Sequence, residues 1–177
     1  MIVVGDNLRQ LMNQYNIVDR ANCFDETCIQ LSLGDTYYEL NPTADKQTLF
    51  YGERIPEDCI KKLSIGENGL LIAPKSSVLA CSAEKVFIPN GYMGLLQTKG
   101  SLARLFVSLH FSDGQIDSGF KGHITFELFN ASSFNICIRK LQPVGNLYIF
   151  KTSTNNHAAY NGRYANSDVP TIQLPFE

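Results

Sequence analysis

Hydrophobic and polar positions change their spacing once along the chain, from a helical period near the start to short alternating runs. Leu8, Leu11, Met12 and Tyr15 recur at helical spacing, and Asp6 precedes them as a candidate cap. The sequence therefore predicts one short N-terminal helix. Later apolar runs are short, and turn residues separate them. The predicted strands are 28–33, 36–40, 69–73, 77–82, 92–98, 105–111, 123–130, 134–138 and 146–150.

This succession of short strands bears on fold class and domain organisation. Strands spaced by roughly 8–12 residues are typical of an antiparallel sandwich or barrel. Turns are predicted at 33–35, 89–91, 113–114, 118–119 and 143–145. No repeat or interdomain linker interrupts the pattern, so residues 1–177 are predicted to form a single all-β domain with a short N-terminal helix.

The last residues differ from the rest. Segment 152–168 is polar and carries His157, Tyr160, Arg163 and Tyr164, and segment 170–176 is apolar again. Two interpretations stay open: a frayed terminus, or an arm that closes over a ligand or a neighbouring subunit.

Composition narrows the function classes. The chain has 177 residues and a net charge of −2, which argues against a generic binder of nucleic-acid strands. A small anionic ligand remains compatible with that charge, because a few cations in one pocket barely change the total. Charged residues make up only 18%, while there are 11 phenylalanines and 8 tyrosines, which suggests a β-rich domain with surface buried in an oligomer.

Neither a membrane span nor a secretory leader is expected. No apolar run approaches the ~20 residues that a spanning helix needs, and residues 1–6 lack a basic region. The 5 cysteines are odd in number and widely spaced, which favours reduced and mostly buried thiols over a disulfide framework. The sequence thus predicts a cytoplasmic protein without membrane contact.

Candidate chemistry is concentrated between residues 97 and 130. Lys99, Gly100 and Ser101 follow a predicted strand and precede a short helical pattern at 101–105. Backbone N–H groups, a hydroxyl and a cation at such a turn suit an anion such as phosphate. An ordinary serine-capped turn with a solvated lysine is the alternative, and spacing alone favours it.

Glu127 is the most informative single residue. Alternation places Ile124, Phe126 and Leu128 on one face of strand 123–130 and Thr125, Glu127 and Phe129 on the other. A carboxylate among aromatic residues faces water, pairs with a cation, or has a raised pKa suited to proton transfer. Arg104 is the obvious candidate for the cation.

Several common catalytic motifs are missing from the sequence. The H-x-E and P-C-x-x-C segments of zinc nucleoside deaminases do not occur, so no zinc site is expected. Neither a P-loop, nor a G-x-G-x-x-G turn, nor a G-x-S-x-G elbow occurs. P-loop hydrolases, dinucleotide enzymes and ordinary serine hydrolases become less favoured.

Two motifs together resemble a known family. The segment KGSLARL at 99–105, then GQIDSGFKG at 114–122, then a strand that carries Glu127, is similar to the dCTP deaminase branch of the dUTPase superfamily. The spacing from Arg104 through Asp117 to Glu127 fits that branch without gaps. The likeness extends to IQLSLG at 29–34, to segment 74–89 and to Tyr160 and Arg163 in the tail.

This resemblance implies a distorted jelly-roll β-barrel that assembles as a homotrimer with active sites shared between subunits, and an arm at 152–177. It implies deamination of dCTP to dUTP and ammonia, without zinc and with Mg²⁺ carried by the triphosphate. Glu127 would be the general base and then acid, held by Arg104. Asp117 would face the 3′-hydroxyl or orient a second water, and His110 would lie near the pyrimidine. The other implied nucleotide-binding residues are Lys99, Gly100, Ser101, Phe111, Asp113, Gln115, Ile116, Tyr160 and Arg163.

Four positions depart from the family pattern. Gly100 replaces a serine, Gln115 an arginine, Asp113 a small residue and Ser167 a glutamine. Asp113 would accept a hydrogen bond from an exocyclic amine or cap a turn, and the turn is favoured. Gly114 also resembles the branch that continues to dUMP and pyrophosphate. A plain dUTPase and a catalytically weak nucleotide-binding member of the superfamily therefore remain as alternatives.

Overall fold

The computed structural model describes residues 1–155 and 158–176, so His157 lies outside the described residues. Strand β1 (Ile2–Val3) is followed by helix α1 (Gly5–Tyr15). The remaining elements are β2 (Ile29–Leu40), η1 (Glu57–Cys59), β3 (Ile60–Ser64), β4 (Leu70–Ile72), β5 (Ser77–Phe87), β6 (Tyr92–Thr98), α2 (Gly100–Ala103), β7 (Val107–Ser108), β8 (Gln115–Ile116), β9 (Lys121–Asn130), β10 (Ile136–Ile138) and β11 (Pro143–Lys151).

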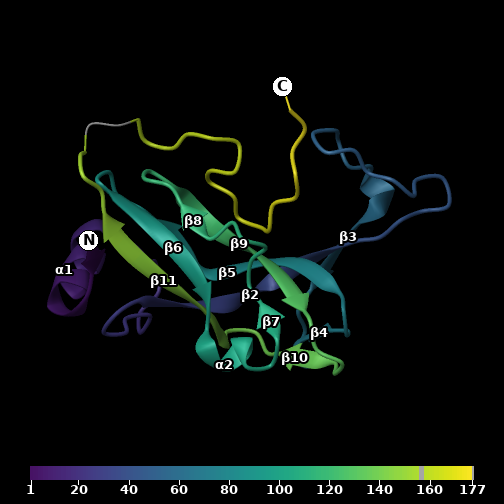
Figure 1. Ribbon diagram of the computed structural model, residues 1–177, viewed down its shortest axis with the longest axis horizontal. Coiled ribbons are helices and arrows are strands. Elements are labelled where there is room, and N and C mark those ends of the chain that lie inside the picture. The colour runs from purple at the N-terminus through teal and green to yellow at the C-terminus, as the bar shows by residue number, and fades with distance from the viewer. Residues whose placement is uncertain (156–157, 177) are drawn as a thin grey trace.

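The described residues form one nine-stranded sheet and one two-stranded sheet. The large sheet has the order β7-β9-β5-β2-β11-β6-β8, with β1 beside β11 and β3 beside β2, and every pair is antiparallel. The small sheet pairs β10 with β4. Figure 1 shows β6 and β11 running steeply across the direction of β2 and β3, as expected for a strongly twisted sheet that curls on itself. The all-β architecture with a short N-terminal helix is confirmed.

The concave side of the curled sheet holds the hydrophobic core. Strand β9 alternates strictly between buried and half-buried or exposed positions, with Phe126 fully buried. Leu31 and Leu33 of β2 and Leu147 of β11 are also fully buried and belong to the same cluster. These strands therefore fix which face of β9 is left for a site.

Helix α1 begins at Gly5, one residue before Asp6, so Asp6 is not the residue that precedes the helix. Val4 is the N-cap, no side chain caps the first turn, and Asp6 lies inside that turn. The expectation that Asp6 caps the helix is therefore wrong, although its carboxylate still lies near the positive end of the helix.

The predicted turn at 33–35 is also wrong. Strand β2 continues through it, with a register shift between Leu33 and Tyr37 against β5. A Cβ on Gly34 would lie 2.9 Å from the carbonyl oxygen of Cys81, so glycine here allows a close approach to β5 rather than a chain reversal. Predicted strand 105–111 shrinks to Val107–Ser108, and β1, β3 and β8 were not predicted.

Four of the cysteines, at positions 23, 28, 59 and 81, are buried, Cys137 is exposed, and all are free. Among the described residues, no helix is both long and apolar enough to cross a membrane.

Candidate active site

A cavity of about 710 Å³ lies between the half-buried face of β9, the segment around β8 and the C-terminal segment. It brings together seven of the residues that the sequence nominates, which are Asp113, Gln115, Ile116, Asp117, Glu127, Tyr160 and Arg163. The central cluster of predicted site residues therefore exists within one chain.

Strand β9 supplies the floor of this cavity. His123, Thr125 and Glu127 are half-buried and line it, while Phe126 and Leu128 point into the core. The predicted alternation of this strand is confirmed, and it explains why a carboxylate can stand in the middle of the sheet without entering the core.

The Glu127 carboxylate is held by backbone rather than by a cation of its own chain. Its Oε2 accepts a hydrogen bond from the N–H of Phe111 at 2.7 Å, and its own N–H donates to the carbonyl of Leu109 at 2.9 Å. Among the described residues no ion pair involves Glu127. A second hollow of about 320 Å³, lined by Tyr38, Phe111 and Glu127 among others, adjoins the same carboxylate. Glu127 is thus oriented and remains open to a ligand.

Segment 113–117 forms the wall opposite β9. The Gln115 side chain donates to Oδ1 of Asp117 at 2.7 Å, and Ile116 pairs with Gly94 of β6. A Cβ on Gly114 would lie 2.6 Å from the carbonyl oxygen of Leu96, so a glycine is required where this wall meets β6. The wall is therefore fastened to the core sheet on one side of the cavity.

His110 and Phe111 are not among the residues that line this cavity, although Phe111 lines the second hollow beside Glu127. The ring of His110 approaches within 3.4 Å of the position that a Gly114 Cβ would take. Its Nδ1 is buried and has no hydrogen-bond partner among the described residues. Phe111 is exposed and its ring packs against that of Phe129 at a centroid distance of 5.5 Å.

The C-terminal segment supplies a third group of residues that line the cavity. Figure 1 shows this segment passing by β8 and β9. The N–H of Tyr160 donates to the carbonyl of Ser118 at 2.7 Å, and its ring lies 6.3 Å from that of Phe120. The Arg163 guanidinium donates to the carbonyl of Pro175 at 2.6 Å and lies over the ring of Phe176 at 5.8 Å. The described part of the tail is therefore folded against its own chain, and closure over a ligand or a neighbouring subunit stays a prediction.

The residues around α2 are not brought to the cavity. Lys99 is the N-cap residue, Gly100 and Ser101 are exposed, and no side chain caps this helix, so the serine-cap interpretation is wrong. Arg104 lines a separate hollow of about 580 Å³, together with Phe106 and Phe134. Figure 1 shows α2 at the opposite end of the sheet from the C-terminal arm.

Sequence reasoning missed several residues that line the cavity. His123 and Thr125 share the face of Glu127, and extending the period of two backwards along β9 would have found His123. Tyr164 belongs to the tail segment that resembles the arm of the family, and it lines the cavity. Segment 171–173 reaches the cavity only because the arm folds back, and no local pattern signals that. No group of three or more His, Cys, Asp or Glu in the described part of the chain could hold a metal ion.

Comparison with known proteins gives a consistent picture. A family model described as dCTP deaminase-like matches residues 2–152. A relative from Corynebacterium kroppenstedtii named "dCTP deaminase, dUMP-forming" is 32% identical over 142 residues, which cover 77% of this chain and 75% of the relative. One of the same name from Acidothermus cellulolyticus is 33% identical over 111 residues, or 60% of this chain. That match spans only 58% of the relative's length.

Among solved structures, the crystal structure of 2′-deoxycytidine 5′-triphosphate deaminase from Agrobacterium tumefaciens is similar to this chain with a TM-score of 0.62. The sequences are 14% identical, and the match covers 84% of this chain and 47% of that one. At this identity the likeness concerns the fold, and it supports the predicted dUTPase-like jelly roll.

Proposed function

Because this chain belongs to the dCTP deaminase-like family, we propose that it deaminates dCTP and then cleaves the product to dUMP and pyrophosphate. One observation carries the proposal: Glu127 stands in the floor of a nucleotide-sized cavity with its carboxylate oriented by a backbone N–H. The names of the relatives, "dCTP deaminase, dUMP-forming", support the two-step form of the reaction.

In the first step a water molecule attacks C4 of the cytosine ring. Glu127 takes one proton from this water as the new C–O bond forms and gives it to N3 of the ring. It then takes the remaining proton of the new hydroxyl group and gives it to the departing amine. The C4–N bond breaks, ammonia leaves, and the products are dUTP and ammonia. General acid–base catalysis by one placed carboxylate is typically worth about 10²–10⁴ in rate.

Other cavity residues would bind the nucleotide. Asp113 would lie near the pyrimidine, with His110 and Phe111 next to it, while Asp117, with Gln115 and Ile116 beside it, would face the sugar. In the second step Asp117 would orient the water that attacks the α-phosphorus, so that a P–O bond breaks and pyrophosphate leaves with dUMP. Tyr160 and Arg163 would contact phosphates from the arm, and both line the cavity.

A second copy of the chain would complete the site. Arg104 lines a different hollow from Glu127, and its neighbours Phe106 and Phe134 are 70% and 76% exposed. Large exposed aromatic side chains that gather in one hollow mark an interaction surface. We infer that α2 of one copy brings Lys99, Ser101 and Arg104 to the cavity of the next copy, in a closed homotrimer. Arg104 would then hold Glu127 and the attacking water.

Mg²⁺ would enter with the triphosphate. The carboxylates of Asp113, Asp117 and Glu127 are spread over the cavity rather than gathered as one ligand set. Phosphate oxygens are ligands that Mg²⁺ accepts together with water. The ion would therefore bind through the substrate and neutralise its charge.

A cytoplasmic location stays a prediction, and the free buried thiols are compatible with it.

The departures from the family pattern have local structural explanations. A Cβ on Gly100 would approach Nη1 of Arg104 within 3.2 Å, so glycine leaves this guanidinium more room. The amide of Gln115 is used to hold Asp117. Asp113 lines the cavity, a position from which its carboxylate would reach a bound nucleotide.

Product analysis tests the proposal. The protein is incubated with Mg²⁺ and either dCTP or dUTP, and nucleotides, ammonia and pyrophosphate are quantified after chromatography. We expect dCTP to give ammonia, dUMP and pyrophosphate. The variant Asp117→Asn should release ammonia and stop at dUTP, and Glu67→Gln, in an exposed turn, serves as the matched control. Thermal stabilisation by dCTP without any product at high protein concentration would instead favour a catalytically weak binding protein.

A further inference from the structure

The C-terminal arm is fastened to the sheet through its own backbone. The N–H of Asn166 donates to the carbonyl of Lys121 at 2.6 Å, and the N–H of His123 donates to the carbonyl of Ser167 at 3.0 Å. Further along, the N–H of Thr171 donates to Oγ1 of Thr125 at 3.0 Å. The arm thus continues the pairing of β9 on the side of the cavity.

Two glycines of the D-S-G-F-K-G segment make room for this docking. Gly122 has a φ of +144°, and a Cβ there would lie 3.0 Å from the backbone nitrogen of Ser167. Gly119 has a φ of +90°, and its Cβ would lie 2.7 Å from the Cβ of Ala159. Any side chain at either position would push the arm away from the sheet, so the segment is shaped to receive the arm.

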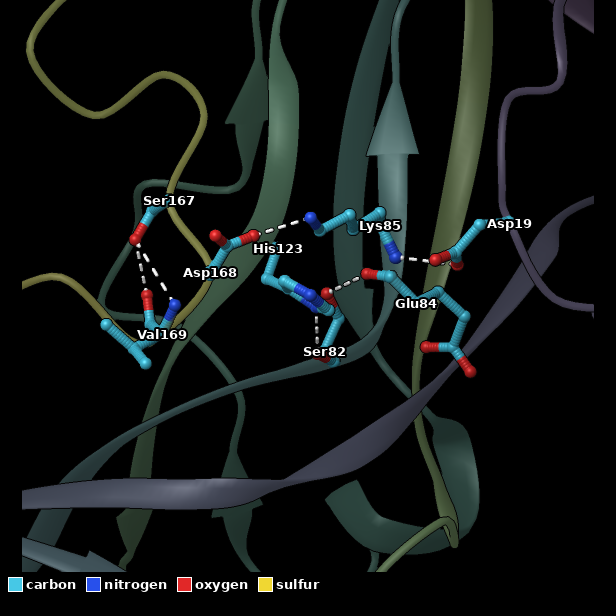
Figure 2. A network of polar contacts seen from close by, with 8 residues as sticks. All are labelled: Asp19, Ser82, Glu84, Lys85, His123, Ser167, Asp168 and Val169. Carbon is cyan, nitrogen blue, oxygen red and sulfur yellow. Dashed lines mark hydrogen bonds and ion pairs between the residues drawn. The ribbon is translucent and has the colours of Figure 1, made fainter.

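An ion pair fastens the arm next to these contacts. Nζ of Lys85, on β5, lies 2.5 Å from Oδ1 of Asp168 on the arm (Figure 2). The neighbouring carboxylate raises the pKa of Lys85, and the lysine lowers the pKa of Asp168. Both groups are therefore charged across the whole neutral range, and the pair needs no ligand to form.

The surroundings of Lys85 hold this side chain in place. Its backbone N–H donates to Oδ1 of Asp19 at 2.8 Å. Beside it, the His123 ring donates from Nδ1 to the carbonyl of Ser82 at 2.7 Å, and Figure 2 shows His123 between the arm and β5. The lysine thus projects from a tethered part of β5 rather than from a free loop.

Ser167 stabilises the turn of the arm next to this ion pair. Its hydroxyl donates to the carbonyl of Val169 at 2.6 Å, which shapes the turn that presents Asp168 to Lys85. The position at which the family pattern has a glutamine therefore serves the arm's own turn in this chain.

We propose that Lys85 and Asp168 are positioning residues that hold the arm over the cavity before any nucleotide binds. Tyr160 and Arg163 then meet the nucleotide from a segment that is already ordered. Ordering a flexible segment costs conformational entropy on binding, so an arm fastened in advance improves affinity without new nucleotide contacts. This inference rests on the proposed function, because the arm would act on a nucleotide bound in the same cavity.

The first experiment measures hydrogen exchange of the amides in segment 160–171 without nucleotide. It compares the wild-type protein with Lys85→Met, Asp168→Asn and the charge-exchanged double variant Lys85→Asp/Asp168→Lys. An exposed ion pair adds little to global stability, so all variants should fold, and exchange in the arm should rise up to about fivefold in the single variants. The double variant should recover most of the protection. Lys140→Met, which removes the similarly exposed pair with Asp35, is the matched control and should leave the arm unchanged.

The second measurement separates positioning from folding. The single variants should raise KM for dCTP by the same factor as arm exchange, with kcat nearly unchanged, and the charge exchange should restore KM. Rapid exchange of the wild-type arm without nucleotide, or no change in the single variants, would overturn the inference whatever the activity. If neither dCTP nor dUTP is converted but the single variants still loosen the arm, the proposed function fails and the fastening stands.

Discussion

The cavity at Glu127 and the hollow at Arg104 differ in how complete they are within one chain. Around Glu127, strand β9, segment 113–117 and the C-terminal segment together line one cavity. The Glu127 carboxylate accepts a backbone hydrogen bond there. Around Arg104, exposed Leu105, Phe106 and Phe134 line an open hollow, and no ion pair among the described residues involves the guanidinium. Under the proposed function, the first region would bind the nucleotide and the second would bind another copy of the chain.

Under the proposed function, this difference means that one chain carries all the predicted residues but would need a second copy to complete the site. Glu127, the proposed proton-transferring group, and Asp117 line the cavity. Arg104, the cation that would hold Glu127, follows α2 and lines the other hollow. A closed ring of copies brings such heterologous surfaces together without leaving a free edge.

Glu127→Gln removes the proton-transferring group and leaves the rest of the cavity intact. The glutamine side chain can still accept the Phe111 hydrogen bond through its oxygen, so the fold and the assembly should persist. Ammonia release from dCTP should fall by about 10²–10⁴, the usual value of general acid–base catalysis. Steady-state assays of ammonia check this, with light scattering as the control for assembly. Full activity in this variant would refute the assigned role.

Phe134→Asp places a charge in the Arg104 hollow, far from the Glu127 cavity. A central aromatic residue of an interface is often worth ~2 kcal/mol or more, so assembly should weaken by about 30-fold or more. Activity at low protein concentration should fall with it. Light scattering against concentration measures the assembly, and Phe50→Asp, which alters another exposed phenylalanine, is the control. An unchanged oligomer would show that this hollow is not an interface.

Gly114→Ala tests the wall of the cavity without touching a functional group. The new methyl group would meet the Leu96 carbonyl at 2.6 Å, so segment 113–117 must shift. A displacement near 1 Å in a binding wall can cost up to 10² in rate, and a loss of about tenfold is expected here. Gly66→Ala is the matched control, because nothing lies within 4 Å of its Cβ position. Equal kinetics for the two variants would show that the wall is not required in this position.

Glu84 contrasts with Glu127 as a carboxylate that lies inside the core. It is 2% exposed, its Oε2 accepts a hydrogen bond from Ser32 N–H at 2.9 Å, and burial raises its pKa above the ordinary 4.5. Since the folded state then binds the proton more tightly than the unfolded chain, stability should decrease as pH rises from that ordinary value through the raised pKa. Glu84→Gln should reduce the change of Tm with pH. Each kcal/mol of pH-dependent unfolding free energy that the variant loses corresponds to about 2–4 °C in Tm. Thermal melts at several pH values check the slope, and a slope unchanged from that of the wild type would contradict the assignment.

The sequence predicted the fold where one face of a strand is buried. The 92–98 prediction coincides with β6, and the alternation in β9 placed Glu127 on the correct face. Gly34 was misleading because a glycine before an aspartate marks a turn in most contexts, whereas here it allows β2 to approach β5. Strand β8 was not predicted, since two residues carry no period and their pairing with β6 is a tertiary effect.

The candidate site divides in the same way. Asp117 and Glu127 both line one cavity. The local alternation of β9 fixes the face that carries Glu127, whereas the wall that carries Asp117 is placed by the pairing of β8 with β6. The predicted partnership of Arg104 with Glu127 is not formed within the chain, and no sequence spacing distinguishes a contact inside a subunit from one between subunits. The fastening of the arm depends on Lys85 and Asp168, which are far apart in sequence and belong to no motif.

Mixing two inactive variants tests most directly the claim that each site is shared between copies. Arg104→Ala and Glu127→Gln are each purified, unfolded together in equal amounts and refolded, and ammonia release from dCTP is measured. In a randomly mixed closed ring, about a quarter of the sites would combine an intact Arg104 from one copy with an intact Glu127 from its neighbour. We expect the mixture to recover about a quarter of the wild-type activity. Activity no higher than that of the two variants refolded separately, with a full oligomer present, would contradict it.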